Sequence, residues 1–378
     1  MISFGPMSIT LLLCAGQGLV LAFLLLCARR NKTANRFLAL LITAVAALIT
    51  PYIIGYAGFY DKWPWLSFAP FSYTLAFGPL IYFYALSLMD RLPTRRWPHF
   101  LPVLFQFLAD AIVFPLPLAT KNWWDGFAHA PVISPMLEFA TLISMAAYGI
   151  AALRRYRLYR QWLADNRTDG VDFDPSWIRN FLIALALVAL IWLGFMAANL
   201  INPARNYFDQ FLLYVVFSLL VIYLGIAGWR HGETPFPAFR MEPEKPGRSD
   251  VEKPVMERDW TGRGKNWLRE IDEAEYWRDP ELTLTSLARR LGTNTAYLSR
   301  ALNESARENF NAIINRRRVA AIQQWLSSPD EARDLMTLAF EAGFSSKASF
   351  NRAFADFAGM SPSAWRLKSQ KQRALESV

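Results

Sequence analysis

The chain has 378 residues, of which 53% are apolar and 19% are charged, and its formal net charge is +9. This apolar content excludes a disordered chain, and a count of only two cysteines excludes a scaffold held together by disulfides. Three ranges of different composition follow one another, 1–229, 230–259 and 260–378, and we interpret them as a membrane domain, a linker and a soluble domain.

Residues 1–229 contain seven apolar stretches, each close to the ~20 residues that a helix needs to cross a bilayer. Prolines such as Pro79, Pro115 and Pro117 interrupt some of them, which neighbouring helices of a bundle can accommodate. We therefore predict an all-α fold that begins with a seven-helix transmembrane bundle, its spans at about 8–28, 37–57, 67–89, 99–119, 132–153, 178–201 and 207–229.

The basic residues between these stretches predict an orientation. Thirteen Lys and Arg residues lie in the loops that follow the first, third and fifth stretches, and only Lys62, Lys121 and Arg205 lie in the alternate loops. Because Lys and Arg are retained on the cytoplasmic side, the N-terminus is expected outside and the C-terminus in the cytoplasm. We expect a multi-pass protein of the inner, cytoplasmic membrane that has the lipid bilayer as a partner.

Four polar residues fall within the apolar stretches of the membrane domain. Side chains that ionise or bond strongly are costly in a bilayer, so they are hypotheses for a functional site. Gln17, Asp110 and Glu138 come to similar depths from the outer side, and Gln106 shares a helix face with Asp110. Together they would form a pocket for a small ligand or a proton. The alternative is a hydrogen-bonded cluster that holds the bundle together.

We expect no cofactor, no metal site and no catalytic residue. His99, His129 and His231 are scattered, and the spacing of Cys, His and Asp does not resemble a metal site. The sequence also lacks a nucleophile elbow and a phosphate-binding glycine loop.

Residues 230–259 are rich in proline and alternating charges, which cannot build a core. We interpret them as a flexible linker whose average reach is roughly 30 Å.

The range 260–378 contains a helix pattern that occurs twice. In the first copy Thr283 caps a helix, the apolar stripe Leu284, Leu287, Ala288 and Leu291 follows, and Gly292 ends it. Asn294 then caps a second helix.

The second copy repeats the same pattern, with the first helix offset by 51 residues and the second helix by 52. Asp334 caps its first helix, Gly343 ends that helix, and Ser346 caps the next one. Matched caps and glycines predict two helix-turn-helix motifs, which an apolar-faced helix at about 309–327 joins. The alternative is a plain bundle of helical hairpins.

The segment 343–366, GFSSKASFNRAFADFAGMSPSAWR, resembles the second-motif signature of AraC-type transcription regulators, and the resemblance extends over about 281–367. It implies that each motif offers its second helix to the major groove of double-stranded DNA. Residues 303–310 depart from the family pattern, because they have Ser, Ala and Arg where relatives often carry glycines. The family's sugar-binding barrel has no counterpart here, and the layout resembles membrane-embedded members.

Exposed residues near the start of each second helix are the expected DNA contacts. They are Thr295, Ala296, Ser299 and Arg300 in the first motif and Lys347, Ala348, Asn351 and Arg352 in the second. The basic run Arg316, Arg317 and Arg318 spans nearly a full helical turn, so only one or two of its members are expected to contact phosphate.

These features predict a one-component transcription regulator that senses a signal through its membrane bundle. Coupling by a change in homodimerisation fits a flexible tether, and cleavage of the linker is a second route. Two other functions remain open: a membrane enzyme or transporter with a regulatory DNA-binding tail, and a passive membrane anchor on a DNA-binding domain.

Overall fold

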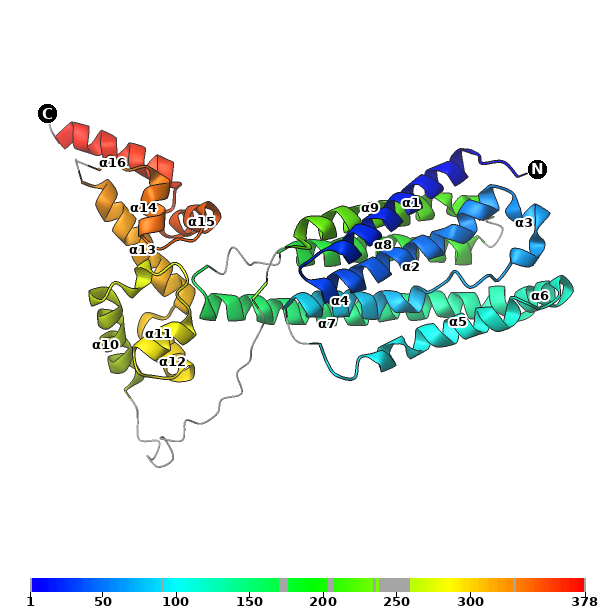
Figure 1. Cartoon of the computed structure of the whole chain (residues 1–378), viewed down its shortest axis with the longest axis horizontal. Helices are drawn as coiled ribbons and strands as arrows, with labels where there is room; N and C mark the ends of the chain where they lie inside the picture. The colour runs from blue at the N-terminus through cyan, green and yellow to red at the C-terminus, as the bar shows by residue number, and fades with distance from the viewer. Residues whose placement is uncertain are drawn as a thin grey trace, which may run out of the picture. The chain divides into compact units, whose positions relative to one another are not determined.

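The computed structural model describes residues 2–89, 92–169, 176–202, 207–233, 236–237, 259–328 and 331–376, and their regular secondary structure is helical (Figure 1). The chain divides into two compact units. The first contains Met1–Arg157 and Pro175–Arg240, and the second contains Leu158–Asp174 and Met241–Val378. Most of the expected linker, 238–258, lies outside the described residues.

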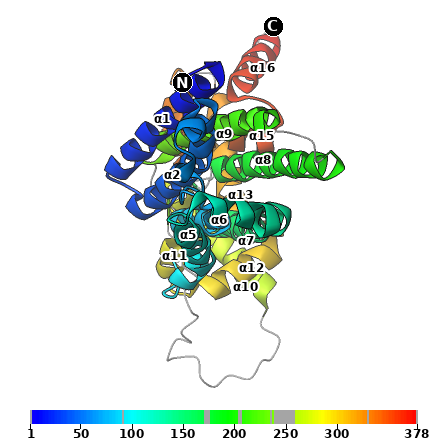
Figure 2. The same cartoon turned by 90° about the vertical axis from the view of Figure 1, so that its right-hand side faces the viewer.

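The first unit is built from long apolar helices joined by short helical turns. Its α-helices are α1 (Pro6–Cys27), α2 (Lys32–Tyr56), α3 (Phe59–Lys62), α4 (Phe77–Met89), α5 (Leu101–Val113), α6 (Leu118–Trp124), α7 (Ser134–Asn166), α8 (Ser176–Ile201) and α9 (Phe211–His231). Short 3₁₀ turns precede α4, α5 and α9, and the π-helical stretch Asp125–Ile133 joins α6 to α7. Helices α1, α2 and α9 pack side by side (Figure 2).

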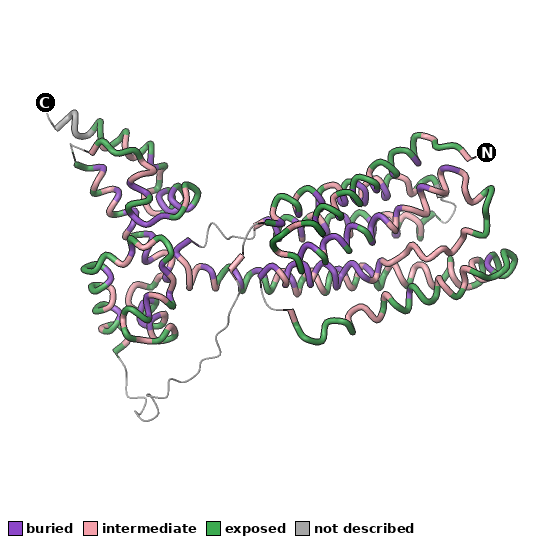
Figure 3. The backbone as a smooth tube through the Cα atoms, viewed as in Figure 1, coloured by how far each residue is buried: buried purple, intermediate pink, exposed green. Residues whose placement is uncertain are grey.

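Five helical runs of this unit are long and apolar enough to cross a membrane. They are Pro6–Cys27, Lys32–Tyr56, Leu118–Asn166, Ser176–Ile201 and Phe208–His231. Many positions along these helices are exposed (Figure 3). The exposed large apolar residues include Leu13, Val20 and Ile143. Because exposed apolar surface of this extent is unfavourable in water, it is consistent with a surface that faces lipid.

The two remaining expected spans are shorter than the sequence suggested. In place of 67–89 the helical run is Thr74–Met89, and in place of 99–119 it is Trp97–Val113. Proline accounts for both differences, since it removes a helical hydrogen bond. Pro70 lies in the non-helical stretch before the first run, and Pro115 and Pro117 follow the end of the second.

The second unit contains the helices α10 (Trp260–Glu273), α11 (Leu284–Arg290), α12 (Thr295–Ala306), α13 (Phe310–Leu326), α14 (Leu335–Glu341), α15 (Lys347–Ala358) and α16 (Pro362–Glu376). One apolar core extends through α10 to α15 and includes Leu287, Leu302, Ile314, Leu338 and Phe354. The helix expected at 309–327 is α13, and its apolar face forms the centre of this core.

The helix pairs α11–α12 and α14–α15 begin with the caps that the sequence predicts. Thr283 accepts a hydrogen bond from the Ser286 amide in a capping box, and Asn294 accepts one from the Tyr297 amide at 2.8 Å. In the second pair Asp334 and Ser346 do the same for α14 and α15. These side chains satisfy the unpaired amides of each first turn, so the helix starts are fixed locally.

Candidate DNA-binding surface

Helix α15 presents one polar, solvent-facing side. Lys347, Ala348, Asn351 and Arg352 are all exposed there. Phe350 and Phe354 on the opposite side are buried in the core, in ring contact with each other. The buried side fixes the rotation of the helix, so the exposed side has a defined direction.

Helix α12 carries the corresponding residues of the first pair. Ala296 and Arg300 are exposed, and Thr295 and Ser299 are partly exposed. The guanidinium of Arg300 donates to Glu304 at 2.8 Å. It also lies 4.9 Å from the centre of the Trp260 ring, which comes from α10. Arg300 therefore contacts both its own helix and α10.

The sequence did not identify Trp260 as part of this surface. Asp259 caps α10 by accepting from the Gly262 amide at 2.7 Å, and this cap places Trp260 in the first turn. An Asp directly before the first residue of an amphipathic stretch was the available signal. The contact with Arg300 spans two helices and could not be read from local spacing.

The basic run on α13 divides into residues with different environments. Arg316 is exposed and paired with Glu308, and Arg317 is paired with Asp272, its Nε lying 2.5 Å from Oδ1. Arg318 is only 1% exposed. Its guanidinium faces the core, so Arg316 and Arg317, which reach the surface, are the members of the run that can supply the one or two expected phosphate contacts.

The buried guanidinium of Arg318 is satisfied by main-chain oxygens. Its Nε donates to the carbonyl of Trp277 and its Nη2 to that of Asp279, both at 2.7 Å. Burial lowers the pKa of Arg318 to about 10, and the nearby carboxylates of Asp169 and Asp279 oppose this change. The side chain thus stays cationic at neutral pH and ties α13 to the loop before α11.

The four polar residues expected to form a membrane pocket have separate environments. Gln106 is buried and donates to Ser72 and Thr74 at 3.1 and 3.2 Å, as in a cluster that stabilises the bundle. Glu138 is partly buried near Trp192. Asp110 is partly exposed near His129. Gln17 is exposed on α1.

Comparison with known proteins identifies the C-terminal part of the chain. Residues 287–368 match the model of a helix-turn-helix domain family of the AraC type. The matched range runs from within α11 to within α16 and covers less than a quarter of the chain. No curated protein and no solved structure matches the chain.

Proposed function

We propose that this chain, whose residues 287–368 are an AraC-type helix-turn-helix domain of a DNA-binding regulator, is a one-component transcription regulator embedded in the membrane. The observation that carries the proposal is the repeated architecture of α11–α12 and α14–α15. Each pair begins with a side-chain cap, turns at a glycine with positive φ, and ends in a helix with exposed polar residues. We infer that both pairs are helix-turn-helix motifs.

In this proposal α12 and α15 enter the major groove of double-stranded DNA. Arginine pairs with guanine O6 and N7, which suits Arg300 and Arg352. Asparagine pairs with adenine N6 and N7, which suits Asn351, and the methyl group of Ala348 suits thymine. Lys347, Thr295, Ala296 and Ser299 complete the set, and Arg316 and Arg317 provide candidate phosphate contacts.

The bundle is proposed to cross the cytoplasmic membrane with the N-terminus outside and the C-terminus in the cytoplasm. Support comes from five helical runs of spanning length, two shorter apolar helices and the bias of basic residues between them. This orientation gives the DNA-binding helices access to the chromosome.

We propose that the bundle is also the sensor. Glu138 is the leading candidate for signal recognition, because it is a partly buried carboxyl group on an apolar helix, near Trp192 of α8 and Tyr52 of α2. Tyr52 in turn stacks on Tyr214 of α9, the ring centres lying 3.5 Å apart. A small molecule bound at this cluster would favour one packing arrangement of the bundle helices. A change in homodimerisation is one route by which this arrangement would alter DNA binding.

Genome-wide mapping of DNA bound by the full-length protein in cells tests this function. A variant with both Arg300→Ala and Arg352→Ala is the matched control, since both side chains lie outside the core. We expect discrete sites for the native protein that the control loses. If the native protein binds no specific DNA sites, the proposal that it is a transcription regulator is wrong.

The other functions make different predictions in the same cells. If unrelated membrane spans can replace residues 1–229 and regulation still responds to the signal, the bundle is only an anchor. If the purified protein turns over or transports a substrate when both arginines are replaced, the bundle is an enzyme or transporter.

A further inference from the structure

Helix α7 belongs to both compact units. Its residues up to Arg157 lie in the first unit, and Leu158–Asn166 lie in the second together with the three residues that follow. We call Leu158–Asp169 the docking segment. Tyr159, Leu163, Thr168 and Asp169 of this segment are buried, with exposed fractions of 1%, 3%, 1% and 7%. The segment therefore packs as part of the second unit.

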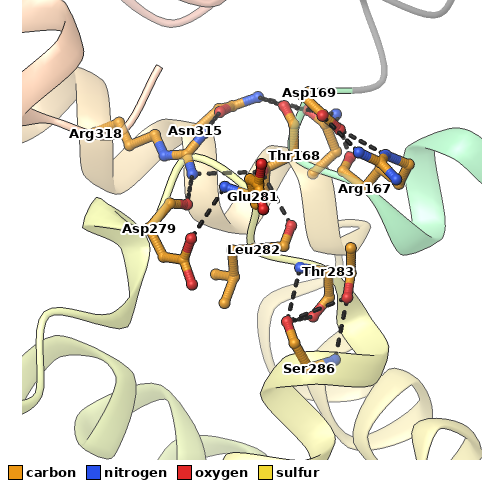
Figure 4. A network of polar contacts seen from close by, with 11 residues as sticks. Arg167, Thr168, Asp169, Asp279, Glu281, Leu282, Thr283, Ser286, Asn315 and Arg318 are labelled. Atoms are coloured by element: carbon orange, nitrogen blue, oxygen red, sulfur yellow. Dashed lines mark hydrogen bonds and ion pairs between the residues drawn. The ribbon is translucent and has the colours of Figure 1, made fainter. Parts of the chain in front are cut away.

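The end of the docking segment is held by specific hydrogen bonds (Figure 4). The Thr168 hydroxyl donates to the Leu282 carbonyl at 3.1 Å and accepts from Arg318 at 3.3 Å. Arg167 forms an antiparallel bridge with Thr283, the cap of α11. These contacts attach the segment to the loop before the first helix pair.

The linking helix α13 provides the other side of this attachment. The side-chain amide of Asn311 donates to the Arg167 carbonyl at 2.8 Å, and that of Asn315 donates to the Thr168 carbonyl at 3.4 Å. Arg167 itself forms a two-bond ion pair with Asp169, at 2.7 and 2.6 Å. Main-chain carbonyls and side chains at the end of the segment thus both have hydrogen-bond partners, as expected of a specific packing interface.

The helical part of the docking segment lies beside α15. Arg160, Leu163 and Ala164 line a hollow of about 240 Å³ together with Arg352 and Asp356 of α15. Arg352 is one of the proposed base contacts. The side chain that would enter the major groove therefore shares a hollow with α7.

A recognition helix fills the groove that it enters. The major groove is about 12 Å wide, and a helix with its side chains is about 10–12 Å in diameter. A second helix that lines the same hollow as Arg352 would therefore collide with the walls of the groove that α15 enters. We propose that the docking segment is an autoinhibitory element that competes with DNA for α15, and that signalling acts by releasing it. This inference depends on the proposed DNA-binding function.

A disulfide across the Arg167–Thr283 bridge tests the proposal in the full-length protein. Cα atoms of antiparallel bridge partners lie about 4.5–5.5 Å apart, within the ~4.4–6.8 Å that disulfides allow. The variant Arg167→Cys/Thr283→Cys is made in a Cys14→Ser/Cys27→Ser background and placed in lipid nanodiscs. The probe is a fluorescent DNA duplex, selected from a random library by the reduced variant and by the native chain in parallel.

We expect the oxidised variant to bind this duplex roughly tenfold more weakly than its own reduced form. Thr283→Cys alone, in the same background, should respond little to the oxidant. Equal or tighter binding by the oxidised variant would overturn autoinhibition, since docking would then be compatible with DNA or would assist it. Failure of the disulfide to form would overturn the docking itself. If no duplex is selected by either protein, the DNA-binding function fails instead.

A second variant weakens the docking without a cross-link. Thr168→Val keeps the shape of the side chain and removes both hydroxyl hydrogen bonds. It should bind the duplex more tightly than the native chain, whereas Thr261→Val, at an exposed position on α10, should not. Weaker binding by Thr168→Val than by the control would count against release as the activating step.

Discussion

Gly343 lies directly against the main chain of Arg278: a Cβ added to this glycine would stand 2.5 Å from the Arg278 carbonyl oxygen. Gly343 has a φ of +87°, and Gly292 at the matching turn of the first pair has a φ of +64°. A Cβ on Gly292 would meet nothing within 4 Å. The two glycines therefore share a left-handed φ but have different surroundings.

This difference predicts unequal effects of the same substitution. Gly292→Ala should destabilise the second unit by about 1 kcal/mol, because alanine disfavours positive φ. Gly343→Ala should cost about 3 kcal/mol or more, because the methyl group also collides with main-chain atoms. Thermal unfolding of both variants, compared with the native protein, measures this. Equal shifts in Tm would show that the main chain of Arg278 moves away from the added methyl group at little cost in free energy.

Arg318 and Arg316 are a second matched pair. Arg318→Leu leaves the carbonyls of Trp277 and Asp279 without their donors, so it should lower the free energy of unfolding by about 3 kcal/mol. Arg316→Leu removes only a surface ion pair and should change it by less than about 1 kcal/mol. Hydrogen exchange of the α13 amides provides the measurement. A small effect at Arg318 would mean that water replaces the guanidinium easily.

Arg307 ends α12 with a φ of 55°, in the left-handed region that favours glycine. Arg307→Gly should therefore stabilise the second unit by up to about 1 kcal/mol. Arg307→Ala, which keeps the Cβ, should leave stability nearly unchanged. The two variants can be compared by their Tm values in parallel melts. If alanine stabilises as much as glycine, the arginine side chain and not the backbone is the cause.

Arg352→Ala should weaken binding at a cognate site by about 1–3 kcal/mol and relax specificity at one base pair. Arg316→Ala should instead weaken binding to all sequences alike and reduce its salt dependence, as expected of a phosphate contact. Titration against duplexes that differ by single base pairs separates these results. An unchanged profile for Arg352→Ala would remove it from the base contacts.

Local patterns predicted the second unit well. Thr283, Asn294, Asp334 and Ser346 act within three residues of themselves, so sequence spacing is enough to identify them as caps. The left-handed turn at Arg307 contains no glycine at that position, so a glycine pattern could not have located it.

Local sequence patterns could not predict contacts between residues that lie far apart in the chain. Arg318 looked like one of three similar arginines, and its burial depends on Trp277 and on Thr168, which is 150 residues away. The same holds for the bundle, where periodicity located the apolar stretches but not the ends at Thr74 and Val113. Gln106 and Glu138 were assigned to one pocket, yet their neighbours differ, because the position of a residue along its helix does not determine which side chains it meets.

The buried position of Thr168 has a consequence for the order in which the protein is made. Arg318, whose guanidinium donates a hydrogen bond to the Thr168 hydroxyl, follows 150 residues later in the chain. At about 5–20 residues per second, the ribosome needs roughly ten seconds or more to reach it. Helices α8 and α9 are synthesised in this interval, so the second unit cannot close around Thr168 until the whole bundle has emerged. A nascent chain therefore completes its DNA-binding unit last, after every helix of the bundle has been made.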